Sequence, residues 1–352
     1  MGGNPSLAQL LAPDCTLMFN EAKEARDVVG RQRERNAGVV AALAARLRSD
    51  TPRAVVTLAR GSSDHAATFA RYLIETKAGV LTSSASPSVG SIYDSTPDLA
   101  GTVLLAISQS GRSPDLLNAA ERGAANGAML VALVNDEESP LAAMADILLP
   151  LCAGPERSVA ATKSFIAALA AVLDLLAAWT GDSRIEAALS ALPDALAESW
   201  ELDWHSAVPV LRTAESMYVA GRGHGLAVAQ EAALKLKETC GIHAEAFSAA
   251  EIRHGPVATI RRDSPVLLFG QPDESLESVE SLATEFAANG AQVISVGVPG
   301  APGICLPLIN ADPLITPILE IASFYRLANS LALALGRDPD RPPHLNKVTE
   351  TL

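Results

Sequence analysis

One short stretch of the chain concentrates side chains that acid–base or metal chemistry uses. The segment KLKETCGIHAEAFSAAEIRHGP starts at residue 235, and its ionisable side chains are Lys235, Lys237, Glu238, Cys240, His243, Glu245, Glu251 and His254. A cysteine followed by His-Ala-Glu is similar to the first half of a zinc-deaminase signature, H-x-E followed by P-C-x-x-C. The stretch could be a metal site, a metal-free acid–base site, or a charged helix and turn.

The zinc interpretation is disfavoured because the second half of that signature is missing. Two closely spaced cysteines should follow His243 and Glu245, and only one cysteine does. The four cysteines of the chain are Cys15, Cys152, Cys240 and Cys305. They lie far apart without a C-x-x-C motif, as expected of scattered thiols in a reducing compartment. We therefore expect no metal and no cofactor.

A metal-free acid–base site is the second interpretation. A carboxylate can act as a general base, and Glu238 is the candidate for that role. Imidazole exchanges protons near neutral pH, and His254 in its Gly-Pro turn is the candidate for that role. The alternatives are surface ion pairs of Glu231, Lys235 and Glu238 at helical spacing, and a solvated turn histidine.

Glu251 has a structural explanation of its own. The sequence Ser-Ala-Ala-Glu at 248–251 matches a capping box at the start of a short helix. We expect Glu251 to be structural first.

Three loops rich in hydroxyl residues follow apolar strands in the first half of the chain. They are GSSDH at 61–65, SQSGRSPD at 108–115 and ERSVAATKS at 156–164. Backbone N–H groups at a helix start, together with hydroxyls, form an anion site that would fit a phosphomonoester. Simple helix capping is the alternative for each loop. Nucleotide binding is disfavoured because no loop ends in G-K-[ST] and Leu226 replaces the third glycine of G-x-G-x-x-G.

The chain also contains an internal repeat. Residues 54–76 align with 216–239, and 102–135 align with 264–298, each as strand, polar loop and helix in the same order. Continuous apolar strands that alternate with helices favour parallel sheets covered on both faces. We predict an α/β protein with two tandem doubly wound parallel-sheet domains.

The predicted organisation has five parts. They are an N-terminal helical segment at 1–49, a first domain at 50–180, a helical connector at 181–205, a second domain at 206–330 and a C-terminal tail at 331–352. The prolines of the tail exclude a helix through them, so we expect an extended arm.

The composition of the chain indicates which kinds of partner to expect. A net charge of -13 and a pI near 4.9 leave no basic face for a nucleic acid, so we expect a small-molecule ligand. The apolar run at 165–179 is broken by Asp174 and is shorter than the roughly 20 residues of a membrane span, so we expect a buried helix. No cationic segment leads into an apolar core at the start of the chain, and we predict a cytoplasmic protein without membrane contact.

These motifs together resemble the sugar isomerase (SIS) domain family over nearly the whole chain. The resemblance rests on RGSSDHAATFARYLIET, ISQSGRSPD, SVAATKSF, EAALKLKETCGIHAEAFSAAEIRHGP and the tail HLNKVTE. Within the family, the chain looks most like the isomerase half of glucosamine-6-phosphate synthase and the stand-alone SIS-fold glucosamine-6-phosphate deaminases.

The resemblance implies roles for individual residues. The Ser-Gln-Ser-Gly loop would bind the phosphate of the sugar, and the first serine turn would contact the sugar. One backbone group and one lysine would add further contacts. The substrate-binding residues are Ser108, Gln109, Ser110 and Ser113 in the phosphate loop, Ser62 and Ser63 in the serine turn, the backbone near Val159, and Lys235. Glu238 would be the base for the proton shift between C1 and C2. His254 would assist ring opening and reach across the interface of a homodimer. Lys347 would meet the carbonyl end of the open-chain sugar, although its tail departs from the usual family pattern.

The resemblance predicts a glucosamine-6-phosphate deaminase that needs no metal. The segment before the first predicted domain is too short for a glutamine-hydrolysing domain, and Cys15 is internal, so we expect ammonia chemistry without glutamine. A deaminase, deglycase or isomerase of galactosamine 6-phosphate or fructosamine 6-phosphate remains open. A non-catalytic sugar-phosphate sensor also remains open, although the acidic N-terminal segment is too small for a helix-turn-helix.

Overall fold

The computed structural model describes residues 12–95 and 97–347, which form two compact units. Unit 1 contains the described residues up to Glu24, the segment Arg157–Thr162 and Asp194–Leu345. Unit 2 contains Ala25–Glu156, Lys163–Pro193 and residues 346–347. The division into five parts made from the sequence stays a prediction.

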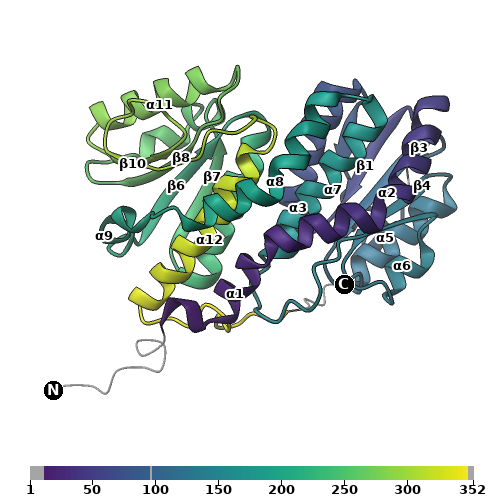
Figure 1. Ribbon diagram of the computed structural model, residues 1–352, viewed down its shortest axis with the longest axis horizontal. Coiled ribbons are helices and arrows are strands. Elements are labelled where there is room, and N and C mark those ends of the chain that lie inside the picture. Colours follow the sequence, from purple (N-terminus) through teal and green to yellow (C-terminus); the bar gives the residue numbers. More distant parts are fainter. Residues whose placement is uncertain (1–11, 96, 348–352) are drawn as a thin grey trace. The chain divides into compact units, whose positions relative to one another are not determined.

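Unit 2 is built on a five-stranded parallel sheet in the order β2-β1-β3-β4-β5 (Figure 1). Its strands are β1 (Ala54–Leu58), β2 (Thr82–Ser84), β3 (Thr102–Ser108), β4 (Met129–Val134) and β5 (Ile147–Pro150). All seven residues of β3 are buried, as expected of a central strand covered on both faces. The order reverses between β1 and β3, and ligands of open α/β sheets bind beyond the strand ends at such a point.

Helices cover both faces of this sheet. One layer contains α2, α3 and α7, which pack on one another, and the other contains α5 and α6, with α4 against α5 (Figure 1). The bounds are α2 (Ala25–Ser49), α3 (Ser62–Leu73), α4 (Ser88–Ser91), α5 (Pro114–Ala125), α6 (Pro140–Met144) and α7 (Lys163–Thr180). A buried apolar cluster that includes Leu58, Leu104, Leu116 and Leu130 fills the space between β1, β3, β4 and α5.

Helix α7 carries the apolar run noted in the sequence. Among the described residues it is the one helix long and apolar enough to cross a membrane, but 83% of its apolar window is buried inside the protein. The prediction of a buried helix is confirmed.

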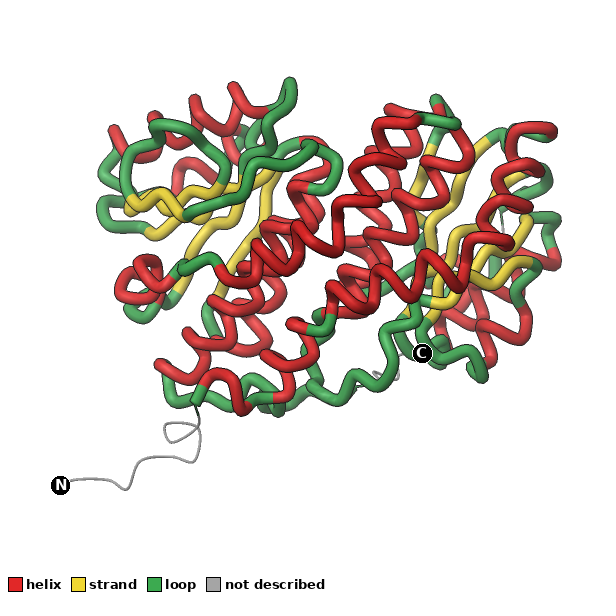
Figure 2. Tube along the Cα trace, viewed as in Figure 1, coloured by secondary structure: helices red, strands yellow, loops and turns green. Residues whose placement is uncertain are grey.

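Unit 1 repeats the same design. Its parallel sheet has the order β10-β9-β8-β6-β7, which read from β7 is the strand order of unit 2. Its strands are β6 (Ser216–Gly221), β7 (His243–Ser248), β8 (Pro265–Phe269), β9 (Gln292–Val296) and β10 (Ile304–Leu306). The predicted pair of doubly wound domains is confirmed, and Figure 2 shows each sheet with its own helices.

The helices of unit 1 also lie on both faces of its sheet. Helix α10 packs on β6, β7 and α12, whereas α11 packs on β8 and β9. The bounds are α1 (Leu17–Lys23), α9 (Val208–Leu211), α10 (Leu226–Lys235), α11 (Leu276–Ala288) and α12 (Thr316–Ala334). The helix α8 (Ser183–Glu201) occupies most of the predicted helical connector. After α12 the chain runs to residue 347 without a helix or strand, as predicted for the tail.

Both repeats end their first helix in a π turn. The turn after α3 covers Ile74–Ala78 and the turn after α10 covers Leu236–Cys240, and each is followed by a glycine with positive φ. Gly241 has a φ of 66°, which favours glycine, and a Cβ there would also displace the Arg337 guanidinium, 2.2 Å away. A π turn bonds each N–H five residues back and often marks a functional position; here it carries Glu238.

Candidate active site

The first group of candidate residues is the Ser-Gln-Ser-Gly loop at the end of β3. Ser108 is the last residue of the strand, and its Oγ accepts a hydrogen bond of 3.0 Å from the Gly111 N–H. Gly111 has a φ of 62°, and a Cβ there would lie 2.3 Å from Ser139 Oγ. The loop therefore needs glycine at this position to keep its shape. Gln109 and Ser110 lie on the same loop, and Ser110 Oγ accepts from the Arg112 N–H at 3.4 Å.

Capping of the following helix does not account for Ser62, Ser63 and Ser113 in the first two loops. Ser113 is the N-cap residue of α5, but its hydroxyl makes no capping hydrogen bond. The N-cap of α3 is Gly61, so Ser62 and Ser63 are the first two residues inside the helix and do not cap it. The expectation that these residues hold a sugar phosphate stays a prediction, and it no longer competes with capping.

Two arginines that the sequence analysis did not select flank the same loop. Arg60 Nη2 lies 2.7 Å from the buried Asp115 carboxylate at the start of α5, and Arg112 Nη2 lies 2.7 Å from Asp136 Oδ2. The Arg112 hydrogen bond lowers the pKa of Asp136. The sequence contained two signals for these residues: Arg60 follows an apolar strand closely, and Arg112 lies inside a polar loop. Both add positive charge where a phosphate would lie.

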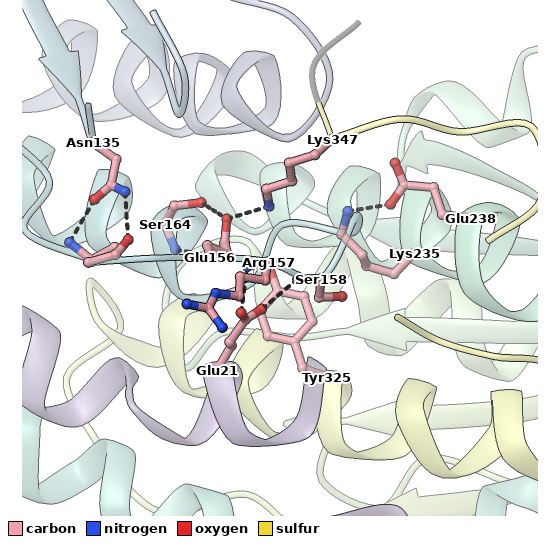
Figure 3. A network of polar contacts seen from close by, with 12 residues as sticks. Glu21, Asn135, Glu156, Arg157, Ser158, Ser164, Lys235, Glu238, Tyr325 and Lys347 are labelled. Carbon is pink, nitrogen blue, oxygen red and sulfur yellow. Dashed lines mark hydrogen bonds and ion pairs between the residues drawn. The ribbon is translucent and has the colours of Figure 1, made fainter. Parts of the chain in front are cut away.

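The second group is a buried ion-pair cluster on α10 and its π turn (Figure 3). Lys235 Nζ lies 2.5 Å from Glu238 Oε2 and 3.3 Å from Glu231 Oε1. The side chains of Lys235 and Glu231 are 0% exposed, whereas Glu238 is 20% exposed. The alternative of surface ion pairs is therefore wrong for this helix. Glu238 is the member of the cluster that a ligand can reach.

Opposing effects set the charge of Lys235. Burial alone lowers the pKa of a lysine, but the carboxylates of Glu231 and Glu238 outweigh it and raise the pKa of Lys235 above its usual value. Tyr325 of α12, which the sequence analysis missed, donates a hydrogen bond of 3.2 Å to Glu231 Oε1. The two carboxylates therefore favour the ammonium form of Lys235, which donates a hydrogen bond to Glu238 Oε2.

His254 lies in unit 1 outside this cluster. It follows the short helix at Glu251–Arg253, its ring is exposed, and its backbone N–H donates to Glu251 O at 2.9 Å. Among the described residues, the structure records no hydrogen bond between the His254 ring and Glu238. An exposed imidazole is free to meet a sugar, but its assigned role stays a prediction.

The predicted capping box at 248–251 is wrong. Ser248 still belongs to β7, and its Oγ accepts from the Ala250 N–H at 3.4 Å and from Arg222 at 3.1 Å. The short helix begins after Ala250 without a side-chain cap.

The residues that first suggested zinc do not converge. The Cys240 thiol is buried and hydrogen-bonds to Ala328 O at 3.5 Å, whereas His243 and Glu245 are exposed on the edge strand β7. In the part of the chain that the structure describes, no group of three or more His, Cys, Asp and Glu residues could hold a metal ion.

Residues far away in the sequence form hydrogen bonds to the third loop, at 156–164. The Glu21 carboxylate of α1 accepts hydrogen bonds from the Arg157 and Ser158 N–H groups at 2.5 and 3.1 Å. The Val159 N–H donates to Asp340 O at 3.1 Å. The backbone contribution expected from Val159 would therefore come from its carbonyl group.

The tail lysine is paired with a buried carboxylate of the same unit. Lys347 Nζ lies 2.9 Å from Glu156 Oε2, and Glu156 is 0% exposed (Figure 3). Glu156 also accepts from the Ser164 N–H and hydroxyl. The sequence analysis placed Glu156 in a polar loop but gave it no role. Residues 348–350 of the tail motif lie outside the described residues.

A cavity of about 420 Å³ in unit 2 lies apart from these residues. It opens between α2, α7 and α8, and its polar lining includes Arg33 and Asp174, which form an ion pair at 3.2 Å. None of the predicted site residues lines it, so we do not place the reaction there.

Comparison with known proteins assigns the chain to a family. The SIS domain model matches residues 51–178 and 210–297, which together are more than half of the chain; the first segment contains the whole sheet of unit 2 and the second contains β6 to β9 of unit 1. The chain belongs to the SIS domain family.

Individual relatives agree with this assignment. The chain is 36% identical over 309 residues to the glutamine–fructose-6-phosphate aminotransferase (isomerizing) of Aeropyrum pernix, covering 82% of this chain and 49% of the relative. The chain thus spans about half the length of the curated relatives it matches.

Solved structures give the same result. A candidate phosphosugar isomerase from Silicibacter pomeroyi is 40% identical, with a TM-score of 0.88 over 92% of this chain and 100% of the other. The C-terminal domain of glucosamine-fructose-6-phosphate aminotransferase from Francisella tularensis is 26% identical, with a TM-score of 0.83 over 93% and 98% of the two chains.

Proposed function

We propose that the protein is a glucosamine-6-phosphate deaminase, an enzyme that isomerises an amino-sugar phosphate and releases ammonia. The observation that carries the proposal is the reachable Glu238 carboxylate, held at 2.5 Å by the buried Lys235 ammonium. A fixed carboxylate is the group that a proton shift between C2 and C1 needs. Membership of the SIS domain family, in which the relatives act on sugar phosphates by name, supports the same reaction class.

The proposed reaction uses each group once. The Ser108–Ser113 loop, with Arg60 and Arg112 beside it, holds the phosphate, and Ser62 and Ser63 contact the sugar. His254 assists opening of the pyranose ring. Glu238 takes the proton from C2 and returns it to C1, while the C1 oxygen gains a proton and the C2 nitrogen loses one, which converts the amino aldose to a ketose imine. Water then hydrolyses the imine to fructose 6-phosphate and ammonia.

Two of the four cysteines are unsuited to act as nucleophiles. Burial raises the pKa of the Cys240 thiol to about 12 and also raises that of Cys152, which makes both weak nucleophiles at neutral pH. In the described ranges no cysteine is hydrogen-bonded to a histidine, the arrangement that would activate a thiol for glutamine hydrolysis. We also propose a cytoplasmic homodimer in which His254 serves the site of its partner.

An ammonia-release assay over a panel of amino-sugar phosphates tests the proposal. The panel contains glucosamine 6-phosphate, galactosamine 6-phosphate and fructosamine 6-phosphate. We expect ammonia mainly from the first, and a loss of roughly 10²- to 10⁴-fold in kcat for Glu238→Gln, the usual contribution of a general base. Glu245→Gln, an exposed glutamate of the same unit, is the matched control and should keep full activity.

Two results would contradict the proposal. Full activity of Glu238→Gln would remove the assigned base. A thermal shift with fructose 6-phosphate, without turnover of any member of the panel, would identify a sugar-phosphate sensor instead.

A further inference from the structure

The cavity between α2, α7 and α8 has a size and a lining suited to a small molecule. Its volume of about 420 Å³ lies in the range of small-molecule sites, and part of its wall is apolar, with Val29, Val40 and Leu192 among the lining residues. All of its lining residues belong to unit 2. None of them has a role in the proposed deaminase reaction, so the cavity needs an explanation of its own.

Two buried amide side chains line this cavity with oxygen atoms that have no protein donor. Gln32 and Asn36 lie one turn apart on α2 and are 2% and 3% exposed. Gln32 Nε2 donates to Ala167 O at 3.0 Å. Asn36 Nδ2 donates to Pro150 O at 2.9 Å. These bonds fix both amides, and among the described residues no donor bonds Gln32 Oε1 or Asn36 Oδ1. Because buried polar atoms are nearly always hydrogen-bonded, the two oxygens call for a donor inside the cavity.

The charges around the cavity favour a cation as that donor. Asp174 and Glu34 line it beside one basic residue, Arg33, whose guanidinium is also paired with Glu186. Arg33 Nε donates to Asp174 Oδ1 at 3.2 Å, while no donor to Asp174 Oδ2 is recorded in the described part of the chain. Burial raises the pKa of Asp174 and Glu186 adds to the rise, whereas Arg33 opposes it only in part. A second positive charge beside Asp174 would therefore stabilise its carboxylate.

Two helix residues that destabilise a helix also line the cavity. Gly30 lies inside α2, and a Cβ at this position would have no atom within 4 Å, so glycine leaves space open here. Pro193 lies inside α8 and has no N–H, so it cannot donate to the carbonyl of Leu189, another lining residue. The cavity thus gains room from one helix and a further acceptor from the other.

We propose that this cavity binds a primary amine with a short aliphatic chain, whose ammonium group is held by the Asp174 carboxylate and by the amide oxygens of Gln32 and Asn36. An ammonium group has three donors and no acceptor, which matches a set of oxygens that lack donors. An alcohol offers one uncharged donor, and a carboxylate offers none. The aliphatic chain packs on the apolar wall, and removing it from water adds to the affinity.

Calorimetric titration with three probes of equal chain length tests the proposal. The wild-type protein is titrated at pH 7 with n-hexylamine, 1-hexanol and hexanoate, which share one aliphatic body and differ in the head group. We expect hexylamine to bind roughly tenfold more tightly than hexanol, the usual effect of a hydrogen bond to a charged group. Hexanoate should not bind, because its charge is repelled by Asp174 and it has no proton to donate.

A pair of glycine variants shows where the amine binds. Gly30→Leu fills the cavity, whereas Gly38→Leu changes a second glycine of α2 that lies outside the lining. Both positions are exposed, and neither has an atom within 4 Å of a Cβ, so both variants should fold. Only Gly30→Leu should lose hexylamine binding. Asp174→Asn should lower the affinity for hexylamine roughly tenfold, to that of hexanol.

Three results would overturn the proposal: no binding of hexylamine to the wild type, equal affinities for hexylamine and hexanol, or equal hexylamine binding by the two glycine variants. Thermal unfolding establishes that each variant is folded. If Asp174→Asn does not fold, the comparison of Gly30→Leu with Gly38→Leu decides the question alone. No turnover is measured, so the outcome is independent of the deaminase proposal.

Discussion

At the scale of single residues, the candidate chemistry depends on charged side chains that are buried and paired. Glu238 and Lys235 lie three residues apart, and the same spacing on an exposed helix would give a weak surface pair. Here the side chains of Lys235 and Glu231 are excluded from water, so each buried charge is stabilised by the opposite charge beside it. The reachable carboxylate is thereby held by a cation that cannot move away.

The buried lysine should therefore be essential for stability. Lys235→Met leaves the carboxylates of Glu231 and Glu238 without their cation, and breaking a buried ion pair typically costs about 3–5 kcal/mol in the free energy of unfolding. Urea unfolding at pH 7 measures this loss. Lys237→Met, at an exposed position two residues on, is the control and should change the free energy by less than about 0.5 kcal/mol. Equal stability of the two variants would show that the cluster does not carry its charges as described.

The residue types of the site could be predicted from the sequence, but their partners could not. Lys235 and Glu238 share one helix, so spacing alone brought them together. Glu156 and Lys347 are separated by 191 positions, and Glu231 and Tyr325 by 94. Such contacts arise from the packing of distant elements, which local patterns do not report.

At the scale of elements, the two repeats use the same parts in the same order. Strand, polar loop, helix and π turn recur in both units, and the strand order is the same. The alignment of the repeats predicted this arrangement because apolar strands and amphipathic helices leave clear periodic patterns. The π turns were not predicted, since residue propensities favour a helix without distinguishing its hydrogen-bond register. The prediction of a capping box was wrong because Ser248 is the last residue of strand β7.

A second buried carboxylate links two elements of unit 1 and should make stability depend on pH. Glu320 of α12 is 0% exposed, and Gln271, just after β8, donates to its Oε2 at 3.1 Å. Burial raises the pKa of Glu320 well above 4.5; the Gln271 hydrogen bond opposes this shift and the nearby Asp273 charge adds to it. The folded protein thus retains a proton on Glu320 that the unfolded chain loses above pH 4.5.

The sign of the effect follows from this proton. As the pH rises above 4.5, the unfolded state binds fewer protons than the folded state, so this group lowers the free energy of unfolding. Glu320→Gln removes the titration and keeps a neutral side chain of the same shape. We expect the variant to gain stability relative to the wild type between pH 5 and 8, as measured by urea unfolding. Parallel stability curves over that range would contradict a raised pKa for Glu320.

At the scale of the whole molecule, the duplication gives each unit its own set of candidate residues. Unit 2 carries the Ser-Gln-Ser-Gly loop and the Glu156–Lys347 pair, and unit 1 carries the Glu238 cluster and His254. Each set lies where its own sheet and helices fix it. Each unit also contains a match to the SIS domain model.

The stoichiometry of nitrogen release tests the central claim most directly. The purified protein is incubated with glucosamine 6-phosphate in the absence of glutamine, and ammonia and fructose 6-phosphate are both measured against the sugar consumed. We expect one ammonia and one fructose 6-phosphate for each sugar lost, and a kcat roughly 10²- to 10⁴-fold lower for Glu238→Gln. Isomerisation that leaves the nitrogen on the sugar, or binding without turnover, would contradict it.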